Sequence, residues 1–177
     1  MERPKLLLIK TGGTIDGCVP EYLEIEQIAS IFSDSVDFKK HVTQSFNAPV
    51  QFSEFEVCKK DSRQITDSDR NIIVQVIERE FNQGTKKFLV THGTFTMADT
   101  GKFLLEHLSA EIKENSSIIL TGAMYPWIIF GSDAPMNLGA SISQLISENA
   151  RGVWICMHGK LFDPKKAIKD VDKLVFM

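Results

Sequence analysis

Two short glycine–threonine segments are the parts of this sequence best suited to chemistry. Residues 11–14 read Thr-Gly-Gly-Thr and residues 92–94 read His-Gly-Thr, and each follows a short apolar run. Glycine lets the backbone approach a ligand closely or take a positive φ, and adjoining backbone N–H groups can stabilise an oxyanion. A threonine hydroxyl is a poor nucleophile unless a base or a desolvated lysine activates it. The two segments are therefore candidates for one site that also needs a basic group.

Each segment taken alone also has a purely structural interpretation. A Gly-Gly turn after a strand is more often only a turn, and threonines commonly cap the helix that follows. Neither GxGxxG nor the GKS/GKT end of a P-loop occurs in the chain, so dinucleotide binding has little support. A flavodoxin-like nucleotide or phosphate binder stays open as an alternative, because a glycine-rich turn can open onto an anion-binding helix end.

The elements that must position these segments alternate between strand-like and helix-like patterns, which is typical of βαβ units around a parallel sheet. We expect neighbouring parallel strands over 5–10, 87–91, 117–120 and 152–157, and a further strand over 50–57. In such sheets ligands bind beyond the carboxyl ends of the strands. Thr14 and Thr94 should therefore face one crevice at that edge.

Helical spacing of apolar residues predicts helices over 23–32, 66–84, 99–108 and around 138–146, placed on both faces of the sheet. Thr66 and Asp69 have the spacing of a capping box at the start of the second of these. We expect a single α/β domain over residues 1–177, a flavodoxin/Rossmann-like three-layer domain with a mostly parallel sheet.

Composition excludes several functional classes. A formal net charge of -3 over 177 residues gives no electrostatic reason to expect nucleic acid or an anionic membrane as a partner. The three cysteines, Cys18, Cys58 and Cys156, show no CxxC pairing, which argues against a disulfide framework or a zinc site. No apolar stretch approaches the roughly 20 residues of a membrane helix. We expect a cytoplasmic protein that binds a small molecule and needs no metal and no cofactor.

Five segments in order resemble the bacterial-type, threonine-dependent L-asparaginase and glutaminase family. Residues 10–15 (Lys-Thr-Gly-Gly-Thr-Ile) resemble its first signature and residues 90–97 (Val-Thr-His-Gly-Thr-Phe-Thr-Met) its second. Residues 60–66 are similar to its substrate-binding turn, and residues 121–126 and 132–138 to its GAM-x-P and SD-x-P-x-NL stretches. The resemblance spans essentially the whole chain and implies the amino-terminal, catalytic domain of that family.

The resemblance also implies roles for individual residues. Thr14 would be the nucleophile that attacks the side-chain amide carbon of the substrate. Thr94 and Lys169 would be the second threonine and its lysine, which activate water or relay protons. Tyr22 would match the tyrosine of the mobile loop that closes over Thr14.

Substrate binding is implied for a second group of residues, with Ser62 holding the α-carboxylate of the substrate. The whole group is Gly13, Asp61, Ser62, Gly93 and Phe95. The implied ligand is an asparagine-like amide or a dicarboxylate.

Phe95 departs from the family pattern, which has an aspartate there that orients the lysine and pairs with the substrate's α-ammonium. Losing an ionic partner in a desolvated site costs roughly 3–5 kcal/mol. We therefore expect weak hydrolysis of L-asparagine and better acceptance of succinamate-like amides that lack the α-amino group. An asparaginase-type amidohydrolase and a non-catalytic binder of an amino acid or dicarboxylate both remain open.

The second departure is length. Family members continue into a second α/β domain, and a neighbouring protomer's copy of that domain completes the active site. This sequence ends soon after Lys169, so three alternatives are open: the completing residues come from another copy of the same domain, from another protein, or not at all. We also expect a homo-oligomer, a dimer or tetramer, because the Trp-Ile-Ile-Phe run at 127–130 would form an exposed hydrophobic patch that a monomer seldom carries.

Overall fold

The computed structural model describes residues 3–16, 50–127, 130–147 and 150–177. The predicted helix over 23–32, Cys18, Tyr22 and the middle of the 127–130 run lie outside these residues. In the described part, no helix is long and apolar enough to cross a membrane.

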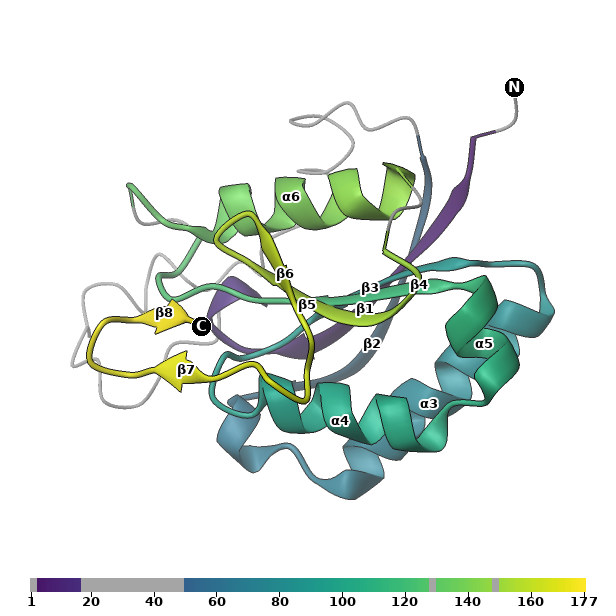
Figure 1. The fold of residues 1–177 in the computed structure, drawn as a ribbon, viewed down its shortest axis with the longest axis horizontal. Helices are drawn as coiled ribbons and strands as arrows, with labels where there is room; N and C mark the ends of the chain where they lie inside the picture. The colour runs from purple at the N-terminus through teal and green to yellow at the C-terminus, as the bar shows by residue number, and fades with distance from the viewer. Residues whose placement is uncertain (1–2, 17–49, 128–129, 148–149) are drawn as a thin grey trace.

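A six-stranded sheet forms the centre of the molecule (Figure 1), with the strand order β2-β1-β3-β4-β5-β6. The first five strands are parallel and β6 pairs antiparallel with β5. The strands are β1 (Lys5–Gly12), β2 (Gln51–Lys60), β3 (Lys87–Thr91), β4 (Ser117–Thr121), β5 (Gly152–Met157) and β6 (Lys160–Phe162). The four predicted parallel strands and the further strand are confirmed, and no observed bound lies more than three residues from its expected position.

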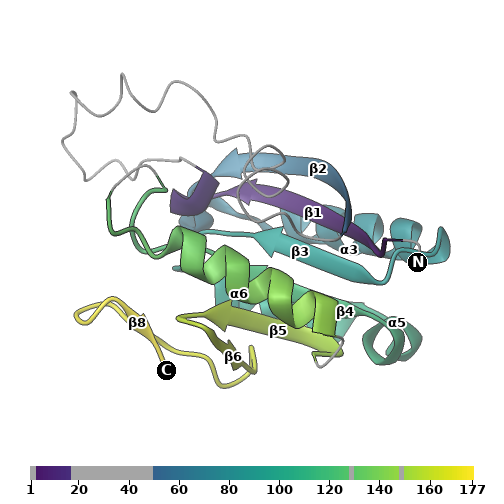
Figure 2. The same ribbon diagram turned by 90° about the horizontal axis from the view of Figure 1, so that it is seen from above.

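Helices cover both faces of the sheet, as predicted. The helix α6 (Ala134–Ser147) lies on one face, and α3 (Asp67–Asn82), α4 (Met97–His107) and α5 (Ala110–Asn115) lie on the other. Figure 2 looks onto the first face, where α6 runs over β3, β4 and β5. Alternate residues of a strand therefore enter different cores: Leu7 and Ile9 of β1 pack with α3 and α4, whereas Leu6 and Leu8 pack with α6.

Local sequence explains where α3 begins. The Thr66 side chain accepts a hydrogen bond from Asp69 N, and the Asp69 carboxylate accepts one from Thr66 N, so the predicted capping box is present. The apolar stripe Ile73, Ile77 and Phe81 is buried. This helix ends at Asn82, just before Gly84, whose φ of +94° suits a residue without Cβ.

The C-terminal segment forms a two-stranded hairpin that the sequence patterns did not predict. It comprises β7 (Lys169–Asp170) and β8 (Val175–Phe176). Backbone hydrogen bonds join Ile168 and Met177 in both directions, at 2.9 and 2.8 Å. Phe176 packs against the core on the α3 and α4 face, and this contact fixes the hairpin beside the carboxyl edge of the sheet.

The prediction that residues 127–130 form an exposed hydrophobic patch is wrong for the first of them, Trp127. Trp127 is partly buried and packs against the core on the α6 face, because its large ring gains more from that contact than from solvent. Phe130 is fully exposed. The two residues between them lie outside the described residues.

Candidate functional site

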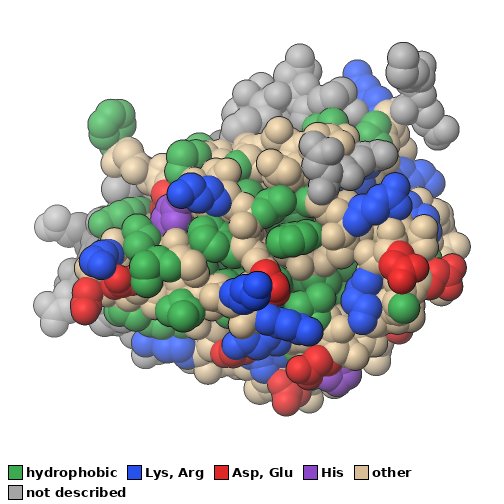
Figure 3. All heavy atoms as spheres, viewed as in Figure 1, with side chains coloured by type: hydrophobic (Ala, Val, Ile, Leu, Met, Phe, Trp, Pro, Cys, Tyr) green, Lys and Arg blue, Asp and Glu red, His purple; other side chains and the backbone are tan. Residues whose placement is uncertain are grey.

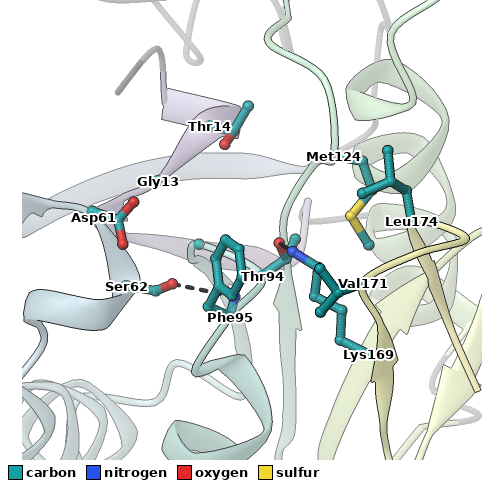
Figure 4. A pocket seen from close by; sticks show the side chains of 11 residues that line it. Gly13, Thr14, Asp61, Ser62, Thr94, Phe95, Met124, Lys169, Val171 and Leu174 are labelled. Carbon is teal, nitrogen blue, oxygen red and sulfur yellow. Dashed lines mark hydrogen bonds between the residues drawn. The ribbon is translucent and has the colours of Figure 1, made fainter. Parts of the chain in front are cut away.

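A cavity of about 240 Å³ opens at the carboxyl edge of the sheet, beside the hairpin (Figure 4). Its volume lies below the roughly 300–1,000 Å³ of pockets for drug-sized ligands, which suits a ligand of amino-acid size. The described residues that line it are Gly13, Thr14, Asp61, Ser62, Gly93, Thr94, Phe95, Met124, Lys169, Val171 and Leu174. The structure therefore brings together all the candidate site residues named from the sequence except Tyr22, which lies outside the described residues.

Two glycines bring the Thr14 turn against the rest of the site. Gly12 and Gly13 have φ values of +98° and +78°, a region that side chains disfavour. A Cβ on Gly12 would lie 2.5 Å from Lys60 N, and one on Gly13 would lie 2.5 Å from Gly93 Cα. Only glycine therefore allows the two glycine–threonine segments to touch. The half-buried Thr14 follows them at the start of the 3₁₀ turn η1 (Thr14–Asp16).

Ser62 joins the short 3₁₀ turn η2 (Ser62–Gln64) to the segment that carries Thr94. Its hydroxyl accepts a hydrogen bond from Phe95 N at 3.2 Å, and its carbonyl accepts one from Thr96 Oγ1 at 2.6 Å. A Cβ on Gly93 would lie 2.7 Å from Ser62 Oγ. The Ser62 side chain is buried, so it has a fixed position in the cavity wall.

Asp61 is the carboxylate that lines the cavity, and Arg63 occupies both of its oxygens. Arg63 Nε donates to Asp61 Oδ1 at 2.9 Å, and its Nη2 donates to Oδ2 at 3.0 Å. These hydrogen bonds are the main reason that the pKa of Asp61 lies below its ordinary value. The charge of this carboxylate is therefore already balanced before a ligand arrives.

Lys169 and Thr94 form the central polar contact of the cavity. Lys169 Nζ donates to Thr94 Oγ1 at 2.7 Å, and Nζ also lies 3.7 Å from the centroid of the Phe95 ring. Burial is the main cause that lowers the pKa of Lys169, the charge of Arg63 lowers it further, and Asp61 opposes the shift. Within the described residues, no carboxylate forms an ion pair with this lysine.

The hairpin positions Lys169 through contacts on its opposite strand. Phe176 N donates to His158 Nε2 at 3.2 Å, and the rings of Phe176 and Phe162 lie 6.2 Å apart. His158 N in turn donates to Asn137 Oδ1 at 2.8 Å. The segment at 132–138, which the sequence marked by resemblance, therefore supports the hairpin and does not line the cavity.

Three apolar lining residues were not identified from the sequence. Met124 follows β4, and the carboxylate of Asp133 fixes it by accepting a hydrogen bond from Met124 N at 3.0 Å. Val171 and Leu174 lie in the hairpin. The Gly-Ala-Met segment after β4 was a usable signal for Met124, whereas the hairpin had none.

His92 is a structural histidine, although it precedes Thr94. It is fully buried, and burial lowers its pKa to about 4. Its Nδ1 lies 2.8 Å from the Gly93 carbonyl, and its Nε2 lies 2.9 Å from Thr100 Oγ1. A carbonyl can only accept, so Nδ1 carries the proton and Nε2 accepts from Thr100. Among the described residues, no group of histidine, cysteine and acidic side chains has the arrangement of a metal site.

A family model and the curated relatives both match this chain to asparaginases. The family model described as "Asparaginase, N-terminal" matches residues 5–172. A probable L-asparaginase 4 of Schizosaccharomyces pombe is 27% identical over 84% of this chain and 41% of its own length. A glutaminase-asparaginase of Acinetobacter glutaminasificans is 25% identical over 94% of this chain and 50% of its own length.

A different kind of relative also matches over part of the chain. One component of the glutamyl-tRNA(Gln) amidotransferase of Methanococcus vannielii is 32% identical over 50% of this chain and 20% of its own length. Among solved structures, a probable cytoplasmic L-asparaginase from Campylobacter jejuni has the same fold, with a TM-score of 0.80 at 23% identity. The alignment covers 98% of this chain and 52% of that one. This chain thus spans about half the length of these asparaginases.

Proposed function

This chain belongs to the asparaginase family through that family's amino-terminal domain, and on that premise we propose that it is an amidohydrolase with Thr14 as its nucleophile. The observation that carries the proposal is the Lys169–Thr94 hydrogen bond of 2.7 Å in a cavity that Thr14 also lines. The cavity thus contains the Thr14 hydroxyl, the Thr94 hydroxyl and Lys169, whose pKa is lowered. A threonine nucleophile needs such a basic group nearby to activate it.

The reaction proceeds in two balanced steps. In the first, Thr14 Oγ attacks the amide carbon, the C–N bond breaks, and the hydroxyl proton leaves with the nitrogen as ammonia. In the second, water attacks the resulting ester and the ester C–O bond breaks; one proton of the water returns to Thr14, and the other passes to solvent as the acid product ionises to the carboxylate. Lys169 acts on water through Thr94, because a lysine with a lowered pKa is more often in the neutral form that accepts a proton.

Charge on the cavity wall argues for a substrate without an α-ammonium group. Two cations face the Phe95 ring, Lys169 at 3.7 Å and Arg63 at 4.9 Å. The lining carboxylate Asp61 is bound by Arg63 through both oxygens. Arg63 and Asp61 balance each other's charge, so an ammonium that enters would meet an aromatic ring and the like charge of Lys169 in place of a free carboxylate. Succinamate-like amides therefore fit this wall better than L-asparagine does.

The alternative function is a binding protein that holds an amino acid or a dicarboxylate without turnover. The observation in its favour is that no described carboxylate orients Lys169. Without such a partner, the lysine could serve as a charged ligand for a carboxylate.

The expected cytoplasmic location also stays a prediction, because one relative is described as cytoplasmic and another, from Haemophilus influenzae, as periplasmic.

Release of ammonia separates the two functions. We expect the protein to release ammonia from succinamate faster than from L-asparagine, in an assay coupled to glutamate dehydrogenase. Thr14→Ala should lower kcat/KM by about 10³-fold or more, and Thr94→Ala by a similar factor, since both act in the chemical step. Thr85→Ala is the control, because Thr85 is as buried as Thr94 but precedes β3 at the opposite edge of the sheet.

Binding measurements complete this test. Tight binding of succinate or L-aspartate, together with no ammonia from any amide, would establish the binding protein and contradict the enzyme. Full activity in Thr14→Ala would contradict the role of Thr14 and leave the reaction class intact.

A further inference from the structure

Asp16 carries a carboxyl group that the reaction described above does not use. It is the last residue of η1, and its backbone N–H donates to Gly13 O at 3.1 Å. Its Oδ2 accepts two hydrogen bonds, from Gly12 N at 2.9 Å and from Thr91 Oγ1 at 2.9 Å. The side chain therefore folds back over the turn from which it projects and reaches a second strand.

This single oxygen joins the two segments that carry the threonines. Gly12 ends β1 and leads into Thr14, whereas Thr91 ends β3 and leads through two residues into Thr94. The contact is reinforced by Thr11 Oγ1, which donates to the Thr91 carbonyl at 2.9 Å. A change in the strength of the Asp16 contacts would thus alter how one threonine turn sits against the other.

The other carboxylate oxygen has no comparable partner. Asp16 Oδ1 is buried and makes no hydrogen bond within the described residues. The connection between the turns does not itself need an ionisable group, since an amide or hydroxyl oxygen would accept the same two hydrogen bonds. A buried polar atom without a partner is unfavourable and needs an explanation, and a functional site is where such groups concentrate.

We propose that Asp16 is a positioning residue that, when ionised, holds the Thr14 turn firmly against the turn that carries Thr94. When Asp16 is protonated, the same contacts are weaker, because hydrogen bonds to a charged acceptor are stronger than those to a neutral one. The inference rests on the proposed function in so far as these two threonines perform the reaction.

The surroundings of Asp16 let its charge change near neutral pH. Burial is the largest effect and raises its pKa to about 7, while the hydrogen bonds from Thr91 and Gly12 lower it. The charged groups that act on it are Lys10 of β1, which lowers the pKa, and Glu56 of β2, which raises it. The side chain that reaches it from β3 is the uncharged Thr91.

An NMR titration tests the inference without needing activity. The amide resonances of Gly12, Thr14 and Thr94 should shift with one shared midpoint near pH 7. Asp16→Asn keeps an acceptor oxygen and removes the charge, so the shared transition should vanish. Glu54→Gln is the control, because Glu54 forms an ion pair with Lys10 without touching the turns. Thr94 resonances that do not follow the Asp16 midpoint, or that still do so in Asp16→Asn, would overturn the inference.

Kinetics add a measurement that a merely structural role would not change. With succinamate, kcat should rise about fivefold as Asp16 ionises, the factor expected for charge assistance to a hydrogen bond, while KM changes little. Asp16→Asn should keep the low kcat at every pH. A flat wild-type kcat would overturn the positioning role and leave the amidohydrolase intact. Absence of turnover on any amide would contradict the proposed function. The amide resonances in the NMR titration would then show by themselves whether Asp16 positions the two turns.

Discussion

At Phe95 two cations share one aromatic ring, and in the proposed function this arrangement disfavours a substrate α-ammonium. Lys169 Nζ and the Arg63 guanidinium lie 3.7 and 4.9 Å from its centroid. A cation–π contact stabilises a cation by about 0.5–2 kcal/mol, less than the ion pair that an aspartate would offer. The sequence identified this residue as a departure from the family pattern. It could not reveal that the ring would itself serve as the partner of Lys169.

Phe95→Asp tests this account at the residue scale. The new carboxylate should raise the pKa of Lys169 and provide a partner for a substrate ammonium. The ratio of kcat/KM for L-asparagine to that for succinamate should then rise by about fivefold to tenfold, the size of a partly solvated charge pair, because position 95 is exposed and Lys169 is half-buried. Phe95→Leu is the control, because it removes the ring without adding charge.

Measurements on the wild-type protein could contradict this role of Phe95. Efficient hydrolysis of L-asparagine, with kcat/KM of about 10⁴ M⁻¹s⁻¹ or more, would contradict the view that Phe95 disfavours the α-ammonium. An unchanged substrate ratio in Phe95→Asp would contradict it equally.

At the scale of elements, the helices and the continuous apolar strands could be predicted, and the two-residue strands could not. The apolar runs of β1, β3 and β4 are buried on both faces, so composition alone indicated strands. The β7–β8 hairpin has strands of two residues each, too short to show any period. Tertiary contacts hold it in place, above all the packing of Phe176 and its hydrogen bond to His158.

The candidate site shows the same division. Gly13, Ser62 and Thr94 could be chosen because short motifs carry them. Val171 lines the cavity only because the hairpin folds beside it. The properties of Asp16 depend on burial and on a hydroxyl 75 residues away in the sequence, so no local pattern could have indicated them.

Asp16 also connects β1 to β3 in a way that makes stability depend on pH. Its pKa is raised from 3.8 to about 7 in the folded protein, so the folded state binds the proton more tightly than the unfolded state does. Its contribution to the free energy of unfolding is fully present below about pH 4 and is lost as the pH rises through about 7. The total change is at most about 4 kcal/mol, at 1.36 kcal/mol for each pKa unit.

Urea unfolding at pH 5 and pH 8 measures this contribution. The free energy of unfolding of Asp16→Asn should decline less between the two pH values than that of the wild type, whatever the variant's absolute stability. Above pH 7, Asp16→Asn would thus be less active than the wild type but would have lost less of its stability. This trade-off is expected where a group that destabilises the fold is kept because activity needs it. Parallel declines in both proteins would mean that Asp16 does not titrate in this range.

For the whole molecule, the cavity and the apolar surface lie at the same end. Figure 3 shows hydrophobic side chains gathered on the face around the C-terminal hairpin, with charged groups between them. The exposed apolar residues of this segment are Ile168, Val171, Leu174 and Met177. Exposed apolar clusters on soluble proteins commonly mark contacts with other chains. With Trp127 packed against the core, this hairpin is a better basis than residues 127–130 for the expected self-association.

We expect the protein to form a dimer or tetramer in which the hairpin is covered. Light scattering after size exclusion should report a mass above the 19.9 kDa of one chain at tens of micromolar. Ile168→Glu should weaken association by about tenfold or more, because it places a charge in a desolvated contact. Ile168 is not among the described residues that line the cavity. Ile72→Glu is the matched control, since Ile72 is an exposed isoleucine on α3. A wild-type protein that is monomeric at this concentration would contradict the prediction, and so would equal weakening by both variants.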